Sequence, residues 1–379
     1  MSEFGIYMHW PFCAAKCPYC DFNSHVRSEI DEAGWTRAIV RELEFMASLQ
    51  SEKPVVQTVF FGGGTPSLMS GKAVGTVLDA IARLWPQAND VEITLEANPA
   101  SADAARFAAY RAAGVNRLSL GVQALNDADL KFLGRLHDVA EAKSALATAM
   151  KNFERVSLDL IYARPKQTPA EWRNELKEAL SFGTEHLSLY QLTIEPATPF
   201  AVLARSGELK IPQDDAAATL YEITQELCEA AGRPAYEISN HAKPGRECRH
   251  NLIYWRYGDY VGTGPGAHGR IASNGKRIAT FCEKLPERWR ERVEQNGHGI
   301  AERNEIRVSD GAREHLLMNL RLAEGLDLSS YEKRWNTKPD SSRVNSLAHD
   351  GFVVQNENRL AATPKGRLVL NALIAALAN

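Results

Sequence analysis

The chain has 379 residues, of which 44% are hydrophobic, and a formal net charge of −3. At about 100–200 residues per domain, this length predicts one large domain and a smaller one. The charge gives no electrostatic basis for binding nucleic acid. No apolar run reaches the ~18 residues of a membrane-spanning helix, and the N-terminus lacks the basic and apolar regions of a signal peptide.

Strand-like and helical patterns alternate through the first half of the chain. Strands are expected at 6–10, 55–61, 91–95, 117–122, 156–162 and 186–192, with helices at 29–49, 71–84, 102–113, 139–152 and 169–182. This alternation predicts a parallel sheet with crossover helices. The six β/α units fall short of the eight of a closed TIM barrel, and an open doubly wound sheet also fits the pattern. In either arrangement, chemistry belongs at the carboxyl ends of the strands.

The second half changes in character. A helix is expected at 214–231 and a short strand at 235–239, and a Gly- and Arg-rich segment follows. Further helices are expected at 311–322, 328–335 and 341–350, before a hairpin formed by 352–354 and 360–362 and a final apolar helix. Three helices and a hairpin resemble a winged helix, but ten Lys or Arg against eight Asp or Glu in residues 307–379 favour a packing module over a DNA-binding one. We predict a core at 1–235, a connecting segment at 236–305 and a C-terminal module at 306–379.

Three of the six cysteines, Cys13, Cys17 and Cys20, lie together just after the first expected strand. Prolines around them disfavour a helix, so a loop is expected that turns the three sulfurs toward one centre. Thiolates suit zinc or iron–sulfur clusters. Because no fourth cysteine follows in the loop, the sulfurs could hold a four-iron cluster with one iron open, or a zinc ion completed by His9 or His25.

The other three cysteines, Cys228, Cys248 and Cys282, are scattered along the chain. Their spacing argues against a disulfide framework and predicts a reducing, cytoplasmic setting.

The spacing C-x3-C-x2-C, with an aromatic residue before the last cysteine, resembles the radical S-adenosylmethionine (SAM) superfamily. The resemblance implies a partial (β/α)6 TIM-like barrel and a [4Fe-4S] cluster whose open iron binds SAM. The glycine-rich stretch 62–66 ends the second expected strand. Because it follows a C-x3-C-x2-C loop, it resembles the segment that cradles the methionyl part of SAM.

Three further strand ends carry polar side chains, namely Glu96, Gln123 and Asp159. A carboxylate inside an apolar run is costly unless it is paired or functional, as for Asp159. Arg135 could pair with a carboxylate. Taken singly, each of these residues fits a structural salt bridge or a surface contact as well as a ligand site.

Together with the stretches 7–13, 62–66, 96–99, 121–123 and 159–162, these residues resemble the anaerobic coproporphyrinogen III oxidase family of radical SAM proteins. The resemblance covers nearly the whole chain, including the C-terminal module. It implies that the three loop cysteines Cys13, Cys17 and Cys20 ligate the cluster. It also implies a SAM site lined by Tyr7, Tyr19, Gly63, Gly64, Thr65, Glu96, Gln123, Arg135 and Asp159.

The chain departs from the true oxidases in two places. Those enzymes carry a further cysteine two residues after the third, where this chain has Phe22, and an N-terminal extension, where only twelve residues precede Cys13. Both features match the sister branch of heme chaperones. That branch carries an H-N-x-x-Y-W motif linked to heme, which stands here as His250, Asn251, Tyr254 and Trp255.

The physical case for this hexapeptide rests on its residue types. Neutral histidine is a common axial ligand of heme iron, and the two aromatic residues offer flat apolar faces to a porphyrin. Arg246, Arg249 and Arg256 could meet the propionates. An amphipathic strand with a hydrogen-bonded histidine is the alternative. No C-x-x-C-H motif supports covalent heme attachment.

We therefore expect a heme chaperone that binds heme, a [4Fe-4S] cluster and SAM, and that transfers heme to an acceptor protein. The alternative is an oxygen-independent coproporphyrinogen III oxidase, in which SAM carries the hard chemistry of an oxidative decarboxylation. A zinc-held scaffold is a third interpretation. The chain needs no membrane anchor of its own, and peripheral contact with a membrane-bound acceptor is compatible with its sequence.

Overall fold

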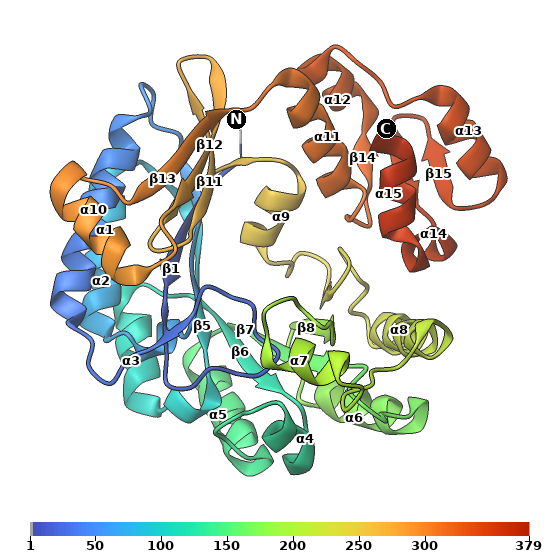
Figure 1. Cartoon of the computed structure of the whole chain (residues 1–379), viewed down its shortest axis with the longest axis horizontal. Helices are drawn as coiled ribbons and strands as arrows, with labels where there is room; N and C mark the ends of the chain where they lie inside the picture. Colours follow the sequence, from blue (N-terminus) through green and yellow to red (C-terminus); the bar gives the residue numbers. More distant parts are fainter. Residues whose placement is uncertain (1–2, 379) are drawn as a thin grey trace.

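The computed structural model describes residues 3–378 and builds them around one curved sheet of eleven strands (Figure 1). Six parallel strands lie side by side in chain order, which confirms the predicted partial barrel. They are β1 (Phe4–Trp10), β4 (Val56–Gly63), β5 (Gln87–Ala97), β6 (Arg117–Gln123), β7 (Arg155–Tyr162) and β8 (His186–Gln191).

Crossover helices cover the outer face of this sheet, as Figure 1 shows. Their starts follow from local capping: α5 and α6 both begin with a capping box, in which an Asp or Thr side chain and a Glu three residues later satisfy each other's backbone donors. The helices of this part of the chain, including the short α4 and α7 that pack in a separate apolar cluster, are α1 (Glu32–Ser48), α2 (Gly71–Leu84), α3 (Ala104–Ala113), α4 (Asp127–Phe132), α5 (Val139–Asn152), α6 (Pro169–Ser181), α7 (Pro199–Arg205) and α8 (Asp214–Ala230).

The barrel stays open because the free edge of β1 pairs with a later strand rather than with β8. β10 (Asp259–Thr263) runs parallel to β1, and three antiparallel strands extend the sheet beyond it. These strands are β11 (His268–Ser273), β12 (Lys276–Cys282) and β13 (Ile300–Glu305), with α10 (Pro286–Asn296) before the last. The sequence patterns did not predict this extension. A separate pair, β2 (Phe12–Cys13) and β3 (His25–Val26), carries the first cysteine.

The C-terminal module has an apolar core of its own and the predicted helices and hairpin. A two-residue strand adds to the hairpin and makes it a three-stranded sheet. The elements are α11 (Val308–Asn319), β14 (Leu326–Asp327), α12 (Leu328–Trp335), α13 (Ser341–His349), β15 (Val353–Asn356), β16 (Arg359–Ala362), α14 (Pro364–Leu368) and α15 (Leu370–Ala378).

One local prediction in the connecting segment was wrong, and one alternative did not hold. Residues 235–239 form no strand, although Ala235 makes an isolated bridge to His241, and the strand there is β9 (Asn240–Ala242) on the edge of β8. The hexapeptide is not the amphipathic strand of the alternative interpretation but part of the helix α9 (Arg249–Trp255), although its histidine is hydrogen-bonded as that interpretation supposed. This helix lies inside the curve of the sheet, between the strands and the C-terminal module (Figure 1).

A buried ion pair holds the start of α9 inside the sheet. Glu92 on β5 accepts a hydrogen bond from Arg155 on β7 at 2.5 Å, with the carboxylate side chain only 1% exposed. The same carboxylate accepts from the His250 backbone N–H at 3.3 Å. Arg155 also donates to the carbonyl oxygens of Arg246 and Glu247, at 3.0 and 2.8 Å. The pair therefore links two strands to the segment that leads into the helix.

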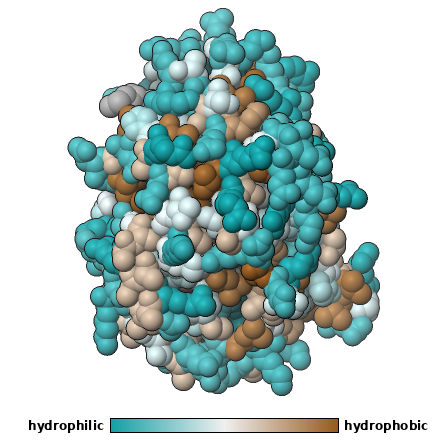
Figure 2. Space-filling view, turned by 90° about the vertical axis from the view of Figure 1, so that its left-hand side faces the viewer, coloured by the Kyte–Doolittle hydropathy of each residue, from teal (hydrophilic) through white to brown (hydrophobic). Residues whose placement is uncertain are grey.

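The face that carries α1, α2 and α10 is mixed, with apolar residues scattered in small groups among hydrophilic ones (Figure 2). Within residues 3–378, no helix has the length and apolar character that crossing a membrane requires.

We expect Glu92→Ala to lower the free energy of unfolding by about 3 kcal/mol, because it leaves the partly buried Arg155 guanidinium without its carboxylate partner. Urea denaturation of the cluster-free protein measures this. The matched control is Glu44→Ala, which removes a surface pair with Arg83 between half-exposed side chains and should change stability by less than ~0.5 kcal/mol. Equal stability of the two variants would contradict the anchoring role of Glu92.

Candidate cofactor and ligand sites

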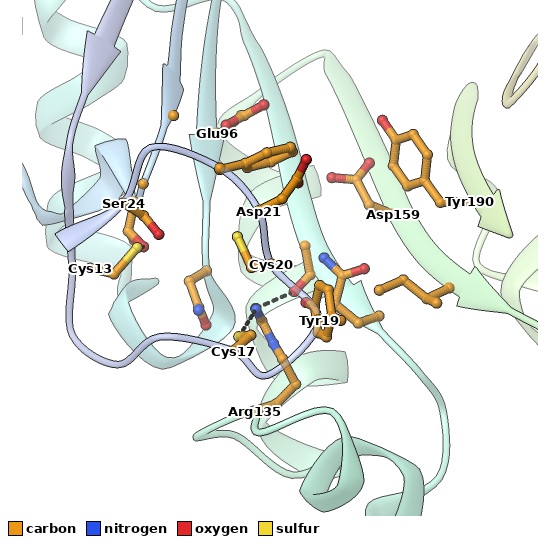
Figure 3. Close-up of a pocket in the computed structure, with 18 of the residues that line it drawn as sticks. Cys13, Cys17, Tyr19, Cys20, Asp21, Ser24, Glu96, Arg135, Asp159 and Tyr190 are labelled. Carbon is orange, nitrogen blue, oxygen red and sulfur yellow. Dashed lines mark hydrogen bonds between the residues drawn. The ribbon is translucent and has the colours of Figure 1, made fainter. Parts of the chain in front are cut away.

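A cavity of about 490 Å³ lies at the carboxyl ends of the parallel strands. We name it the cluster cavity, because the three loop cysteines border it (Figure 3). Every residue predicted for the cluster or for SAM lines this cavity except Tyr7. The residues brought together are Cys13, Cys17, Cys20, Tyr19, Gly63, Gly64, Thr65, Glu96, Gln123, Arg135 and Asp159.

The cysteine loop is positioned by contacts to its sulfurs. Thr65 donates a hydrogen bond to Cys13 Sγ at 3.3 Å, and Arg135 Nη1 donates to Cys17 Sγ at 3.5 Å. Burial raises the pKa of the Cys13 and Cys20 thiols, while donors aimed at sulfur favour the thiolate, the form that binds metal. In the described part of the chain, no three His, Cys, Asp or Glu side chains are close enough to hold a single metal ion. Three thiols from one loop around a roomy cavity are a donor set that fits an iron–sulfur cluster.

The glycine turn at the end of β4 brings backbone close to this loop. Gly63 has a φ of +108°, and a Cβ there would lie 2.6 Å from the His9 ring. A Cβ on Gly64 would lie 2.7 Å from the carbonyl oxygen of Phe12. Side chains are therefore excluded at both positions, and the backbone itself forms the cavity wall, as a site that cradles a ligand with main-chain groups requires.

Two carboxyl groups point into the same cavity from neighbouring parts of the sheet (Figure 3). Asp159 accepts hydrogen bonds from Ser119 at 3.1 Å and from Ser157 at 3.2 Å. Burial, together with the nearby Asp159 charge, raises the pKa of Glu96 to about 8. Burial also raises the pKa of Asp159, against its serine hydrogen bonds. The cavity thus holds two carboxyl groups that a cationic ligand would help to ionise.

Arg135 and Gln123 leave polar atoms without partners at this cavity. Arg135 Nη2 donates to the Gly121 carbonyl at 2.8 Å, and Arg135 makes no ion pair with any residue from 3 to 378, contrary to the carboxylate pairing that the sequence allowed. Its Nε and the Oε1 of Gln123 are buried without a hydrogen bond. Unsatisfied buried polar atoms beside a cavity are free to meet a polar ligand such as SAM.

A second cavity, of about 540 Å³, lies between the sheet, α9 and the C-terminal module. We name it the aromatic cavity. It contains Tyr7, which was predicted for the SAM site, and three of the four residues predicted for heme. Its lining comprises Tyr7, His9, Tyr190, Glu237, Ser239, Asn240, Asn251, Tyr254, Trp255, Tyr260, Gly266, Ala267, His268 and Met318.

The fourth heme candidate, His250, lies behind this wall. Its side chain is only 1% exposed and stacks on Phe60 at 5.1 Å between ring centroids. Its Nδ1 is hydrogen-bonded to Thr58 Oγ1 at 2.6 Å, and its Nε2 to the Tyr254 hydroxyl at 2.7 Å. Neither ring nitrogen is free for iron in this arrangement.

The three arginines that could have met heme propionates also lie outside the cavity lining. Each is engaged in surface ion pairs: Arg246 with Glu154 and Glu185, Arg249 with Asp90, and Arg256 with Glu3 and Glu324.

Sequence reasoning missed several side chains that matter here. Tyr190 lines both cavities and so separates them. Ser119, Ser157 and Ser188 surround Asp159 from three adjacent strands. A signal for them was present, since each of these strands contains a Ser between two apolar residues at an inward position, in R-L-S-L, R-V-S-L and H-L-S-L. Met318 carried no local signal.

The chain is similar to known proteins over nearly its whole length. The family model of the radical SAM superfamily matches residues 7–179, and the family model of the HemN C-terminal domain matches residues 309–369. The chain is 37% identical over 380 residues to the heme chaperone HemW of Escherichia coli (strain K12), covering 99% of this chain and 98% of that protein. It is 37% identical over 384 residues to radical S-adenosyl methionine domain-containing protein 1, mitochondrial, of Bos taurus, covering 98% of this chain and 87% of that protein.

Among solved structures, coproporphyrinogen III oxidase (HemN) from Escherichia coli, described as a radical SAM enzyme, has a TM-score of 0.83 at 22% identity. The likeness covers 100% of this chain and 90% of that chain, and it concerns the fold.

The superfamily match spans β1 to β7 with the cysteine loop between them, so this chain is a radical SAM protein, a class that implies a [4Fe-4S] cluster and SAM. The similarity over nearly the full length is more specific. The chain belongs to the family of the heme chaperone HemW, and the family resemblance found in the sequence is confirmed.

We expect anaerobic reconstitution to give about four irons per chain with broad visible absorption, since a cluster of this type needs all three thiolates. Cys17→Ala should lose the iron and the absorption. Cys228→Ala, which removes a thiol buried in the apolar core, is the matched control and should keep both. Iron analysis and absorption spectra measure this. Stoichiometric zinc without iron uptake would rule out a cluster.

A second prediction concerns the Glu96 carboxyl, whose folded-state pKa of about 8 lies above its ordinary value of 4.5. The folded chain therefore holds this proton more tightly than the unfolded chain, and the stability it contributes is lost as pH rises toward and through about 8. Between pH ~6 and pH ~9, the unfolding midpoint of the cluster-free wild type should fall relative to Glu96→Gln. Glu178→Gln, on an exposed face of α6, should follow the wild type. Parallel curves for wild type and Glu96→Gln would contradict the raised pKa.

Proposed function

We propose that this protein is a heme chaperone, which binds heme and passes it to an acceptor protein. The observation that carries the proposal is the similarity at 36–37% identity, over 99% of this chain, to three bacterial proteins named heme chaperone HemW. The aromatic cavity supports it, because its volume lies within the ~300–1,000 Å³ of cofactor pockets and its walls include four tyrosine rings and one tryptophan ring.

The residues of the cluster cavity would serve a [4Fe-4S] cluster and SAM. When bound, this pair supplies one-electron chemistry and an iron with an open position for SAM. Cys13, Cys17 and Cys20 would hold the cluster. Arg135 donates to the Cys17 sulfur, and a hydrogen bond to a ligating sulfur stabilises the reduced cluster by offsetting its added charge.

The other side of the cavity would hold SAM. Gly63 and Gly64 present backbone rather than side chains, and Glu96 and Asp159 offer carboxylates to the positive groups of SAM. The unpartnered Gln123 Oε1 adds an acceptor. Ser119 and Ser157 fix the Asp159 carboxylate, so that it meets a ligand without first reorienting.

The second candidate function is the oxygen-independent oxidation of coproporphyrinogen III, which the fold of the solved relative favours. Against it stands Phe22, where the oxidases have a further cysteine. Phe22 lines the cluster cavity with 60% of its side chain exposed, so no thiol is present at that point. We therefore regard SAM and the cluster as serving a regulatory or delivery step.

We also propose a reducing cytoplasmic location for this protein. All six cysteines are free thiols, and three of them border the cluster cavity. Peripheral contact with a membrane-bound acceptor is part of the same proposal.

One experiment separates the two functions. The reconstituted protein is titrated anaerobically with hemin and, in parallel, incubated with coproporphyrinogen III, SAM and a reductant. A chaperone should show saturable Soret absorption at about one heme per chain, since such pockets are few per protein, and should form no protoporphyrinogen. Sustained protoporphyrinogen formation without saturable heme binding would refute the chaperone function.

A further inference from the structure

We propose that His268, rather than His250 of the hexapeptide, is the residue that binds the heme iron, and that the heme occupies the aromatic cavity. This inference rests on the proposed function, because it takes heme as the ligand. It assigns the iron ligand to the start of β11, outside the hexapeptide. The aromatic residues of the hexapeptide then form one wall of the aromatic cavity.

The other histidines near the cavity are engaged in hydrogen bonds or sealed from it. His250 has both ring nitrogens hydrogen-bonded and does not line the cavity. His9 does line it but is 5% exposed, donates from Nε2 to the Asn23 carbonyl at 2.9 Å and accepts at Nδ1 from the Tyr7 hydroxyl at 3.1 Å. His241 is 1% exposed and lies outside the lining. An iron ligand needs a free nitrogen that faces the cavity, and none of the three offers one.

His268 meets that requirement. It is the first residue of β11, its side chain is exposed, and it lines the aromatic cavity. Within residues 3–378, no hydrogen bond engages its ring nitrogens. Partial burial, with the charges of Arg270 and Lys284, holds the pKa of His268 below its usual value. Its ring is therefore neutral at pH ~7, the form that binds heme iron.

The backbone that carries His268 is already fixed in the ligand-free chain. Glu42, fully buried on α1, accepts from Thr263 Oγ1 and from the Gly264 N–H, both at 2.8 Å. Asn23 from the cysteine loop donates to the Pro265 carbonyl at 2.9 Å. The turn before His268 is thus tied to α1 and to the cysteine loop, so little conformational entropy remains to be lost on binding.

The surroundings of His268 suit the rest of a heme. The centroids of the His268 and Phe281 rings lie 4.6 Å apart, and the Lys284 ammonium lies 5.4 Å from the centroid of the Phe281 ring. Lys284 is exposed and forms no ion pair with any described residue, whereas Arg270 is paired with Glu314 at 3.1 Å. Lys284 lies outside the cavity lining, so its charge is available to a propionate that extends past His268.

The aromatic side chains of the hexapeptide then form a wall for the porphyrin. Tyr254 packs edge-to-face on Tyr260, with ring centroids 4.4 Å apart, and its hydroxyl is held by His250 at 2.7 Å. Trp255 lines the same cavity, and its carbonyl accepts from Asn319 of the C-terminal module at 2.7 Å. His250 is in this view a positioning residue, which acts on heme through Tyr254.

The test is hemin titration of the reconstituted full chain with the variants His268→Ala and His250→Ala. His268→Ala should weaken heme binding by roughly tenfold or more, since even outer partners of metal ligands cost about 10–100-fold. It should also shift the Soret band, and added imidazole should restore the wild-type band. His250→Ala should keep the position of the Soret band while lowering thermal stability. His349→Ala, an exposed histidine at the end of α13, is the control and should match the wild type.

The outcomes are distinguishable. If the wild type binds heme and His268→Ala shows the same affinity and spectrum, His268 is not the ligand, although the proposed function stands. If His250→Ala instead loses the wild-type band and imidazole restores it, the ligand is the hexapeptide histidine. If the wild type shows no saturable heme binding, the proposed function and this inference fail together.

Discussion

The Glu92–Arg155 ion pair inside the curved sheet holds the segment that leads into α9. A carboxylate 1% exposed cannot stay charged without donors. The donors available are an arginine from two strands away and the backbone at the start of α9. A seven-residue helix would not hold its shape alone in water. The buried pair therefore supplies what helix propensity cannot, and it fixes the hexapeptide inside the sheet.

The regular part of the fold could be predicted from sequence because hydrophobic periodicity and turn residues determine it. The predicted helices at 71–84 and 139–152 coincide with α2 and α5, where capping serines and aspartates mark the starts. The helical form of the hexapeptide could not be predicted, because the helix packs on β1 and β4 and is hydrogen-bonded to Glu92 of β5, all far away in the chain. The same holds for β10, which joins the sheet beside β1 although some 250 residues of sequence separate them.

The candidate sites also have one part that could be predicted from the sequence and one part that could not. Residues of the cluster cavity converge because parallel strands deliver their carboxyl ends to one edge, so the sequence alone allowed Glu96, Gln123 and Asp159 to be placed together. The position of Tyr7 could not be predicted, since an inward residue in the middle of β1 can face either cavity. Nor could the state of His250, because residue type does not reveal that Thr58 and Tyr254 occupy both nitrogens.

The C-terminal module takes part in the aromatic cavity rather than sitting apart from it. Met318 on α11 lines the cavity, and Asn319 beside it holds the Trp255 carbonyl. The Ala323 N–H also donates to the Tyr236 carbonyl at 2.9 Å. A ligand in this cavity would therefore touch the sheet, α9 and the module at once, and its binding would favour the docked module. Because Tyr190 borders both cavities, a ligand at the cysteines and a ligand against α9 would meet at one side chain.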